Sequence, residues 1–422
     1  MNKPDSRLTN PRTTIENVVR DNYGKMLAAL IYQFKDMDLA EDSLQDAIAS
    51  ALLSWEKPGL PENPIAWIIK TAKHKIIDRI RRDKIFSNKQ MLIAALDNEM
   101  HGEGIDGFID EQIPDERLRL IFTCCHPAIP EAARIALTLK TLCGLSTIQI
   151  ANAFLSQETT IAQRLVRAKN KIKVAGISYE VPSADQWGER LSSVMSVAYL
   201  IFNEGYCSVS AEKSVQIDLC HEGIQIAKTL MQLLPTEPEI IGLLALMYFH
   251  ATRFSARLNH QGEIISLAEQ DRSLWSQEYI VAGDKLLKAA MMMGNMGAYQ
   301  IQAAISAVHA HTSNYEETDW AQITLLYEKL YQYKPSPVVE LNAAVALSFA
   351  QGPNAGLAAL ESIEKEKVMQ NYQPLFAAKA DILNRAKKYE TARMYYKKAI
   401  KLTVNQADKN WLQDQLEAIS SP

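Results

Sequence analysis

The stretch that decides the fold is residues 145–165, which read LSTIQIANAFLSQETTIAQRL. Apolar residues recur at helical spacing in both halves, and Ser146 and Ser156 precede them. Serine is a favoured helix N-cap, because its hydroxyl accepts a hydrogen bond from a backbone N–H of the first turn. The stretch therefore predicts two helices joined by a tight turn. The residues expected to face inward are Ile148, Ile150, Ala151, Phe154, Ile161 and Leu165.

The outward face of the second helix carries side chains that bind DNA well. Residues 157–173 hold five basic residues and one acid. Gln and Arg read adenine and guanine edges in the major groove, whereas Thr and Lys suit phosphates. The pattern predicts a helix-turn-helix with the DNA-contacting residues Thr159, Thr160, Ala162, Gln163, Arg164, Arg167 and Lys171. The alternative is a basic amphipathic helix without a DNA role, but a capped two-helix pattern is more specific than charge alone.

A second basic helix lies earlier in the chain, at residues 64–82, which read PIAWIIKTAKHKIIDRIRR. Pro64 suits the first helical position, where its missing N–H costs nothing. Helical spacing places Ile68, Ile69, Ala72, Ile76, Ile77 and Ile80 on the packed side, with Trp67 as a core residue. The exposed candidates for DNA contact are Lys73, His74, Lys75, Asp78, Arg79 and Arg82. Alone, this helix is a weak signal.

Charge is segregated along the 422 residues, although the whole chain carries only −4. Residues 1–90 carry +3, residues 91–116 carry −8 without a basic residue, and residues 117–177 carry +7. The remaining residues, 178–422, carry −6. Blocks of this kind say more about binding partners than the overall charge does.

Helical periodicity continues almost without interruption, and strand signals are nearly absent, so we expect an all-α fold. The expected parts are a three-helix domain over 12–85, an acidic linker over 86–114, a helix-turn-helix domain over 115–177, and a helical-repeat domain over 184–422. Residues 372–402 resemble a tetratricopeptide unit in their small and aromatic positions. The polar N-terminus and the lack of a long apolar run predict a cytoplasmic protein without membrane contact.

The order and spacing of these segments resemble an extracytoplasmic-function sigma factor of bacterial RNA polymerase. The resemblance rests on the acidic segment DLAEDSLQDA at residues 38–47, on the helix at 64–82 and on the helix-turn-helix. Residues 121–128, IFTCCHPA, and 200–206, LIFNEGY, are similar to the subgroup with a long tetratricopeptide-like C-terminal extension.

The resemblance implies roles for three helices. The acidic segment matches the part that docks on core RNA polymerase, through Asp38, Glu41, Asp42, Gln45 and Asp46. The helix at 64–82 matches the part that engages and opens the minus-ten promoter element. The second helix of the helix-turn-helix matches the part that reads the minus-thirty-five element. The linker is then expected to thread through polymerase, although its composition fits a solvated disordered segment equally well.

Several features resemble chemical sites without a convincing ligand pattern. Cys124, Cys125 and His126 lack the usual gap between zinc ligands, so we interpret them as packing residues. Residues 203–206 and 269–275 fit turns and interhelical hydrogen bonds better than a ligand pocket. The methionines at 291–293 are interpreted as helix core rather than as an adaptable binding surface. We expect no cofactor, no metal and no enzymatic activity.

The sequence thus predicts a sigma factor whose partners are core RNA polymerase and promoter DNA. We expect the C-terminal domain to regulate it, either through a regulatory protein or through an intramolecular contact. One alternative is a free-standing helix-turn-helix regulator with a ligand- or partner-sensing helical domain. A C-terminal enzyme using Glu204, Asp271 or Arg272 is another, and a scaffold is the third.

Overall fold

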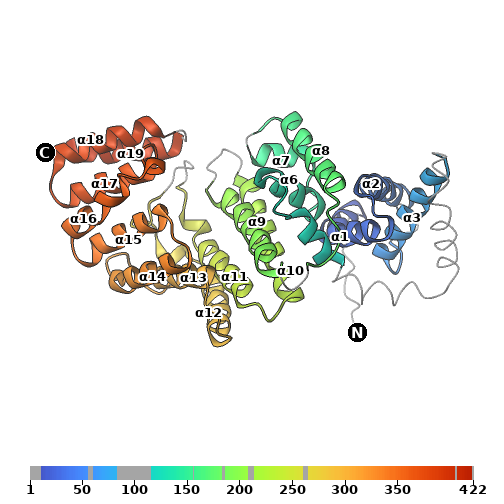
Figure 1. Cartoon of the computed structure of the whole chain (residues 1–422), viewed down its shortest axis with the longest axis horizontal. Helices are drawn as coiled ribbons and strands as arrows, with labels where there is room; N and C mark the ends of the chain where they lie inside the picture. The colour runs from blue at the N-terminus through green and yellow to red at the C-terminus, as the bar shows by residue number, and fades with distance from the viewer. Residues whose placement is uncertain are drawn as a thin grey trace, which may run out of the picture. The chain divides into compact units, whose positions relative to one another are not determined.

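The computed structural model describes residues 11–55, 60–82, 116–154, 156–182, 186–207, 213–259, 265–403 and 406–420. These residues form helices and their connections, without a β-sheet, which confirms the expected all-α class (Figure 1). The chain divides into a first unit, residues 1–204, and a second unit, residues 205–422. The predicted linker at 86–114 lies outside the described residues.

The first unit begins with a three-helix bundle made of α1 (Pro11–Phe34), α2 (Met37–Ser54) and α3 (Pro64–Arg82). The Asp36 carboxylate accepts a hydrogen bond from the Leu39 amide at 3.0 Å and so caps α2. The Asn63 side chain caps α3 in the same way, through the Ala66 amide at 3.0 Å. The helix at 64–82 begins and ends where the sequence predicts.

A helix-turn-helix part follows in the same unit. It contains a helical segment over residues 116–124, then α6 (Glu131–Thr141), α7 (Thr147–Ala153) and α8 (Glu158–Val174). Gly144 turns the chain ahead of α7 with a φ of 72°, a left-handed conformation that glycine adopts without steric cost.

The first half of α9 (Trp187–Cys207) packs on the helix-turn-helix part. Arg190 Nη2 donates to the Phe122 carbonyl at 2.8 Å, and Ser193 Oγ donates to the Cys125 carbonyl at 2.6 Å. The Trp187 ring lies 5.4 Å from the Phe122 ring, centroid to centroid. The expected domain start at residue 184 therefore precedes a helix that covers buried groups of the first unit.

The second unit is a succession of helices that pack on their neighbours in chain order. Their bounds are α10 (Lys213–Leu233), α11 (Pro238–Ala251), η1 (Phe254–Ala256), η2 (Arg272–Leu274), α12 (Gln277–Met292), α13 (Ala298–Ala310), α14 (Trp320–Tyr333), α15 (Pro337–Ala350), α16 (Pro353–Ile363), η3 (Lys367–Met369), α17 (Gln373–Arg385), α18 (Tyr389–Leu402) and α19 (Gln406–Ser420). Pro238, Pro337 and Pro353 each begin a helix, as proline does readily.

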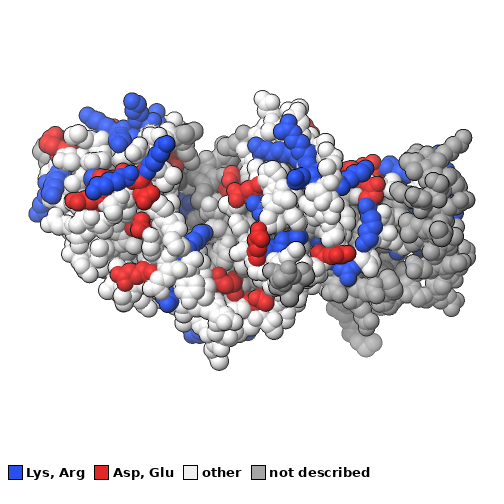
Figure 2. Space-filling model, viewed as in Figure 1, with Lys and Arg blue, Asp and Glu red and all other residues white. Residues whose placement is uncertain are grey.

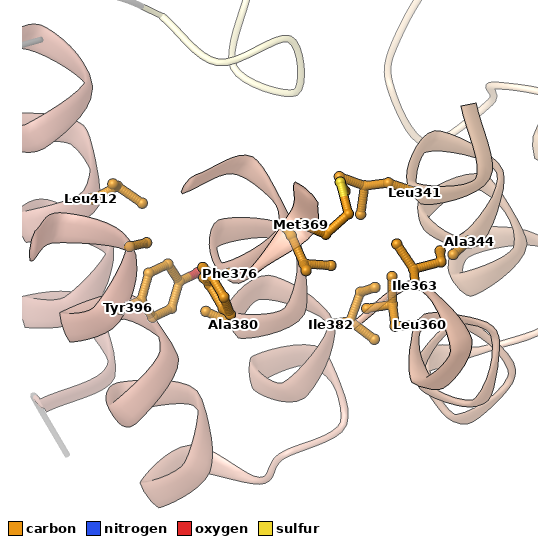
Figure 3. Close-up of a cluster of buried hydrophobic side chains, with 12 residues drawn as sticks. Leu341, Ala344, Leu360, Ile363, Met369, Phe376, Ala380, Ile382, Tyr396 and Leu412 are labelled. Atoms are coloured by element: carbon orange, nitrogen blue, oxygen red, sulfur yellow. The ribbon is translucent and has the colours of Figure 1, made fainter. Parts of the chain in front are cut away.

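The C-terminal end of this unit has a continuous apolar core (Figure 3). Leu360, Ala380 and Ala399 are fully buried, and Tyr396 is 1% exposed. Gly356 allows α15 and α16 to approach closely, because a Cβ at this position would lie 2.4 Å from Ser348 Cβ. Ala380 and Ala399, two small positions of residues 372–402, are thus buried, whereas Tyr389 of the same pattern is 48% exposed.

The interpretation of the methionine run as core is wrong. Met291, Met292 and Met293 are 54%, 89% and 41% exposed. They lie at and just beyond the C-terminal end of α12, where the chain turns at Gly294. Consecutive residues at a helix end point in different directions around the axis, so a neighbouring helix cannot cover all of them.

Candidate nucleic-acid and polymerase interfaces

The first helix of the predicted helix-turn-helix is held by a reciprocal cap. Ser146 Oγ accepts from the Gln149 amide at 3.2 Å, and Gln149 Oε1 accepts from the Ser146 amide at 2.7 Å. This is a capping box, and it fixes the start of α7 as predicted. The predicted Ser156 cap is wrong, because Gln157 is the N-cap of α8 and makes no side-chain cap bond. The Ser156 amide instead bonds the Ala151 carbonyl at 2.9 Å and closes the turn.

The packed face of the motif is largely as predicted, with one exception. Ile150, Ala151, Ile161 and Leu165 are buried, and Phe154 is half-buried. Ile148 is 55% exposed, so its predicted inward position is wrong. Positions two residues apart lie about 200° apart around a helix, so α7 cannot bury both Ile148 and Ile150 against one neighbour.

The candidate recognition face of α8 is accessible. The exposed members are Thr159, Ala162, Gln163, Arg167 and Lys171, and the half-buried members are Thr160 and Arg164. Figure 2 shows Lys and Arg side chains gathered over α8. Glu158 is the only acid in this helix and lies in its first turn, where it suits the positive end of the helix dipole.

The candidate DNA face of α3 is only partly free. All six apolar residues predicted to pack are buried. His74, Asp78 and Arg82 are exposed, and Lys73, Lys75 and Arg79 are half-buried. Arg79 pairs with two acids of α2, Asp42 at 3.0 Å and Asp46 at 2.9 Å. Trp67 packs its ring edge-to-face with Trp55 at 5.2 Å between centroids, as a core residue does.

The candidate polymerase-docking residues of α2 are engaged inside the first unit. Glu41 is buried, with its side chain 7% exposed, and pairs with Lys169 at 2.7 Å and with Lys140 at 3.1 Å. Lys169 also pairs with Asp38 at 2.7 Å. All four candidate acids thus have a basic partner, and Gln45 is exposed.

Lys140 and Lys169 belong to α6 and α8, so these ion pairs join the helix-turn-helix part to the three-helix bundle. Burial alone lowers the pKa of Lys169, but Glu41 and Asp38 outweigh it and raise the pKa above its usual value. Burial and then Glu41 raise the pKa of Tyr23, which lies in the same contact. The contact therefore favours the charged form of Lys169.

Two glycines bring the backbones of these parts together. A Cβ at Gly24 of α1 would lie 2.5 Å from the Leu142 carbonyl oxygen, which follows α6. A Cβ at Gly144 would lie 2.9 Å from the Tyr23 ring. We call the two glycines and the ion pairs of Glu41 the closed contact. Sequence reasoning did not find Lys140 or Lys169, although Lys169 follows buried Ala168 and Leu165 at the edge of the apolar stripe.

The adjacent cysteines lie in the core of the helix-turn-helix part. Cys124 Sγ lies 3.2 Å from Thr141 Oγ1, and Cys125 Sγ lies 3.5 Å from Thr138 Oγ1. Both are at most 1% exposed, as expected for packing residues. Among the described residues, no group of three or more His, Cys, Asp or Glu side chains is arranged to hold a metal ion.

Comparisons with known proteins cover nearly the whole chain. Residues 18–85 match the family described as Sigma-70 region 2, and residues 190–291 match a family of unknown function, DUF6596. An uncharacterized protein of Rhizobium meliloti (strain 1021) is 38% identical over 397 residues, which are 94% of this chain and 93% of that protein. No solved structure matches the chain.

No helix in the described part of the chain is long and apolar enough to cross a membrane. Sigma-70 region 2 acts in transcription initiation, where it binds core RNA polymerase and promoter DNA. The relative that aligns over nearly the whole chain and the two matched families agree with the resemblance to a sigma factor that the sequence suggested. The chain therefore belongs to the RNA polymerase sigma factors that carry a C-terminal extension.

Proposed function

We propose that this protein is a promoter-specificity subunit that directs core RNA polymerase to promoters with its own minus-ten and minus-thirty-five elements. The observation that carries the proposal is the accessible basic face of α8 behind a capped α7. Gln163, Arg164 and Arg167 are the side chains that discriminate bases in this assignment. Thr159, Thr160, Ala162 and Lys171 complete the surface against the groove and the phosphates.

In this proposal, the three-helix bundle of α1, α2 and α3 contacts the minus-ten element and core RNA polymerase. We assign contact with promoter DNA to His74, Asp78 and Arg82, which are exposed on α3, and to the half-buried Lys73, Lys75 and Arg79. Asp38, Glu41, Asp42, Gln45 and Asp46 of α2 are the docking residues. Most of them are exposed, and Glu41 is the buried exception.

We further propose that polymerase docking and the closed contact compete for α2. Lys140 and Lys169 hold Glu41 and Asp38 in the free chain, and Arg79 holds Asp42 and Asp46. A basic surface on polymerase exchanges with these lysines when the helix-turn-helix part moves away from α2. The exchange replaces one set of ion pairs by another, so it need not carry a large net cost.

The second unit is assigned a regulatory role through protein contacts or through a contact within the chain. The matched DUF6596 family lies mostly in this unit and carries no assigned activity. Asp271, which the enzyme alternative uses, caps Ser273 at 2.9 Å, and Arg272 donates to backbone carbonyls. These bonds support a structural use of both residues over a catalytic one.

The test is run-off transcription on a promoter library with purified core RNA polymerase. The full chain is compared with Arg164→Ala/Arg167→Ala, and with Lys173→Ala as a control that removes a neighbouring charge outside the candidate face. We expect core-dependent initiation that the double variant loses and the control keeps. Tight, specific duplex binding by the full chain without core, and no initiation with core, would favour the free-standing regulator instead.

A further inference from the structure

Three arginines of the second unit lie close together around two aromatic rings. The arginine cluster consists of Arg253, Arg257 and Arg272 with Tyr206 and Trp275. The guanidinium carbon of Arg253 lies 5.6 Å from the Tyr206 ring centroid and 5.9 Å from that of Trp275. Residues 203–206 and 269–275, which the sequence assigns to turns in preference to a ligand pocket, supply Tyr206 and Trp275, and the fold brings both rings to the same arginine.

Two of the arginines make contacts within the protein that explain their positions. Arg257 stacks on Tyr206 at 3.7 Å and donates to the Tyr206 backbone carbonyl. Arg272 lies 4.8 Å from the Trp275 ring and donates from Nη1 to the carbonyls of His309 at 2.6 Å and Thr312 at 2.9 Å. These two arginines therefore tie the chain segments around the cluster together.

Arg253 makes no comparable hydrogen bonds within the described residues. Within the described residues, its guanidinium makes no hydrogen bond and no ion pair, and it lies near two aromatic rings. Arg253 itself is half-buried, but Arg272 Nη2 and Trp275 Nε1 beside it are buried donors without a hydrogen-bond partner among those residues. Buried hydrogen-bond donors in folded proteins are nearly always paired. Two unpaired buried donors at one place therefore indicate a missing hydrogen-bond acceptor.

The local charge has the same sign. Burial is the main cause that lowers the pKa of Arg253; Tyr206 acts against this shift, and Arg257 adds to it. Burial and then Arg253 lower the pKa of the neighbouring His309 to about 4, which leaves that ring neutral at pH 7. Glu316 faces Arg272 and Asp408 faces Arg257, but neither comes within ion-pair distance in the described structure.

We propose that the arginine cluster binds a small oxyanion, a carboxylate or phosphate group of a metabolite, with Arg253 as the main ligand-binding residue. A planar guanidinium matches both groups through paired N–H donors. The rings of Tyr206 and Trp275 lie within about 6 Å of the Arg253 guanidinium, at the distance of a cation–π contact. The site makes the second unit a sensor of a small acidic molecule, and it stands whether or not the chain acts as a sigma factor.

Isothermal titration calorimetry of the full chain with inorganic phosphate and with citrate, at constant ionic strength in chloride, tests the site. The two titrants separate phosphate from carboxylate preference. We expect saturable binding of at least one, weakened at least about tenfold by Arg253→Gln, since a hydrogen bond to a charged group is worth that much or more. Lys397→Gln removes an exposed charge of the same unit and should bind as the wild type does.

Circular dichroism melts show whether Arg253→Gln is folded. Arg253→Lys keeps the positive charge but loses the paired N–H donors of the guanidinium, so it should bind the anion with intermediate affinity. Thermal stabilisation of the wild type should rise with the logarithm of the bound anion's concentration. Equal stabilisation of the wild type and folded Arg253→Gln would mean general salt action and would overturn the site. Absence of saturable binding by both phosphate and citrate would overturn it as well.

Discussion

Replacing Lys169 by methionine removes the centre of the closed contact while keeping a helix-forming side chain. A hydrogen bond to a charged group is worth about 1.5–3 kcal/mol. Glu41 keeps Lys140 at 3.1 Å, so the loss stays below the roughly 3–5 kcal/mol of a fully orphaned buried charge. Asp38 is 74% exposed and adds little. We expect a loss of about 2 kcal/mol, near the middle of these limits.

The expected result has two parts, one in stability and one in binding. The thermal transition of the first unit should fall by roughly 4–8 °C, as about 2 kcal/mol does in a domain of this size. If the free energy acts on the closed contact, the ratio of open to closed chain rises about 30-fold. The apparent affinity for core RNA polymerase then rises by up to the same factor, because more of the chain is competent to bind.

Core binding is measured by fluorescence anisotropy of the labelled full chain, with Lys173→Met as the control on the exposed side of the same helix. Gly24→Val opens the same contact by steric means, since a Cβ there would meet the Leu142 carbonyl oxygen at 2.5 Å. Both variants should bind core more tightly than the control. A lower melting temperature with unchanged core affinity would refute the competition, and unchanged melting would refute the ion pair itself.

Three further predictions concern folding. Burial is the first cause that lowers the pKa of His250 to about 3, and His309 is lowered to about 4. Both rings stay neutral in the folded chain. Their contribution to the free energy of unfolding is therefore complete above the pKa of histidine in the unfolded chain, and it is lost as the pH falls below that value. From pH 7.5 to 5.5 we expect a loss of about 1.4 kcal/mol for each histidine by urea titration, halved in His309→Gln. Gly356→Val should destabilise the second unit by about 1–3 kcal/mol in the same assay, because α15 leaves no room for the added carbons. A chain of residues 1–183 should melt well below one of residues 1–207, which keeps α9, and equal melting would contradict that helix's packing role.

The sequence predicts long amphipathic helices well and short ones poorly. The isoleucines of α3 repeat at three- and four-residue spacing over 19 residues, so one face is defined and all six packed residues are right. α7 has only seven residues, and its apolar residues at 148 and 150 compete for one buried side. The pattern alone does not say which of them packs. The methionines at 291–293 fail for a related reason, because periodicity does not show where the neighbouring helix ends.

The closed contact lies beyond any local pattern. Glu41 and Lys169 are 128 residues apart, and each has the composition of an ordinary surface residue. Only the fold decides that the acid is buried and that the lysine reaches it. The arginine cluster is intermediate, since its segments stand out in the sequence, but their convergence on Arg253 depends on the three-dimensional path between them.

The adjacent thiols of Cys124 and Cys125 have a chemical consequence. Burial raises the pKa of both, that of Cys125 to about 11, so neither carries appreciable thiolate at neutral pH. Thiolate is the form that reacts with peroxides and alkylating reagents. The pair is therefore protected from oxidation as long as its surroundings are intact, and it becomes reactive when they open. The rate at which these two sulfurs are alkylated therefore reports how often the helix-turn-helix core opens.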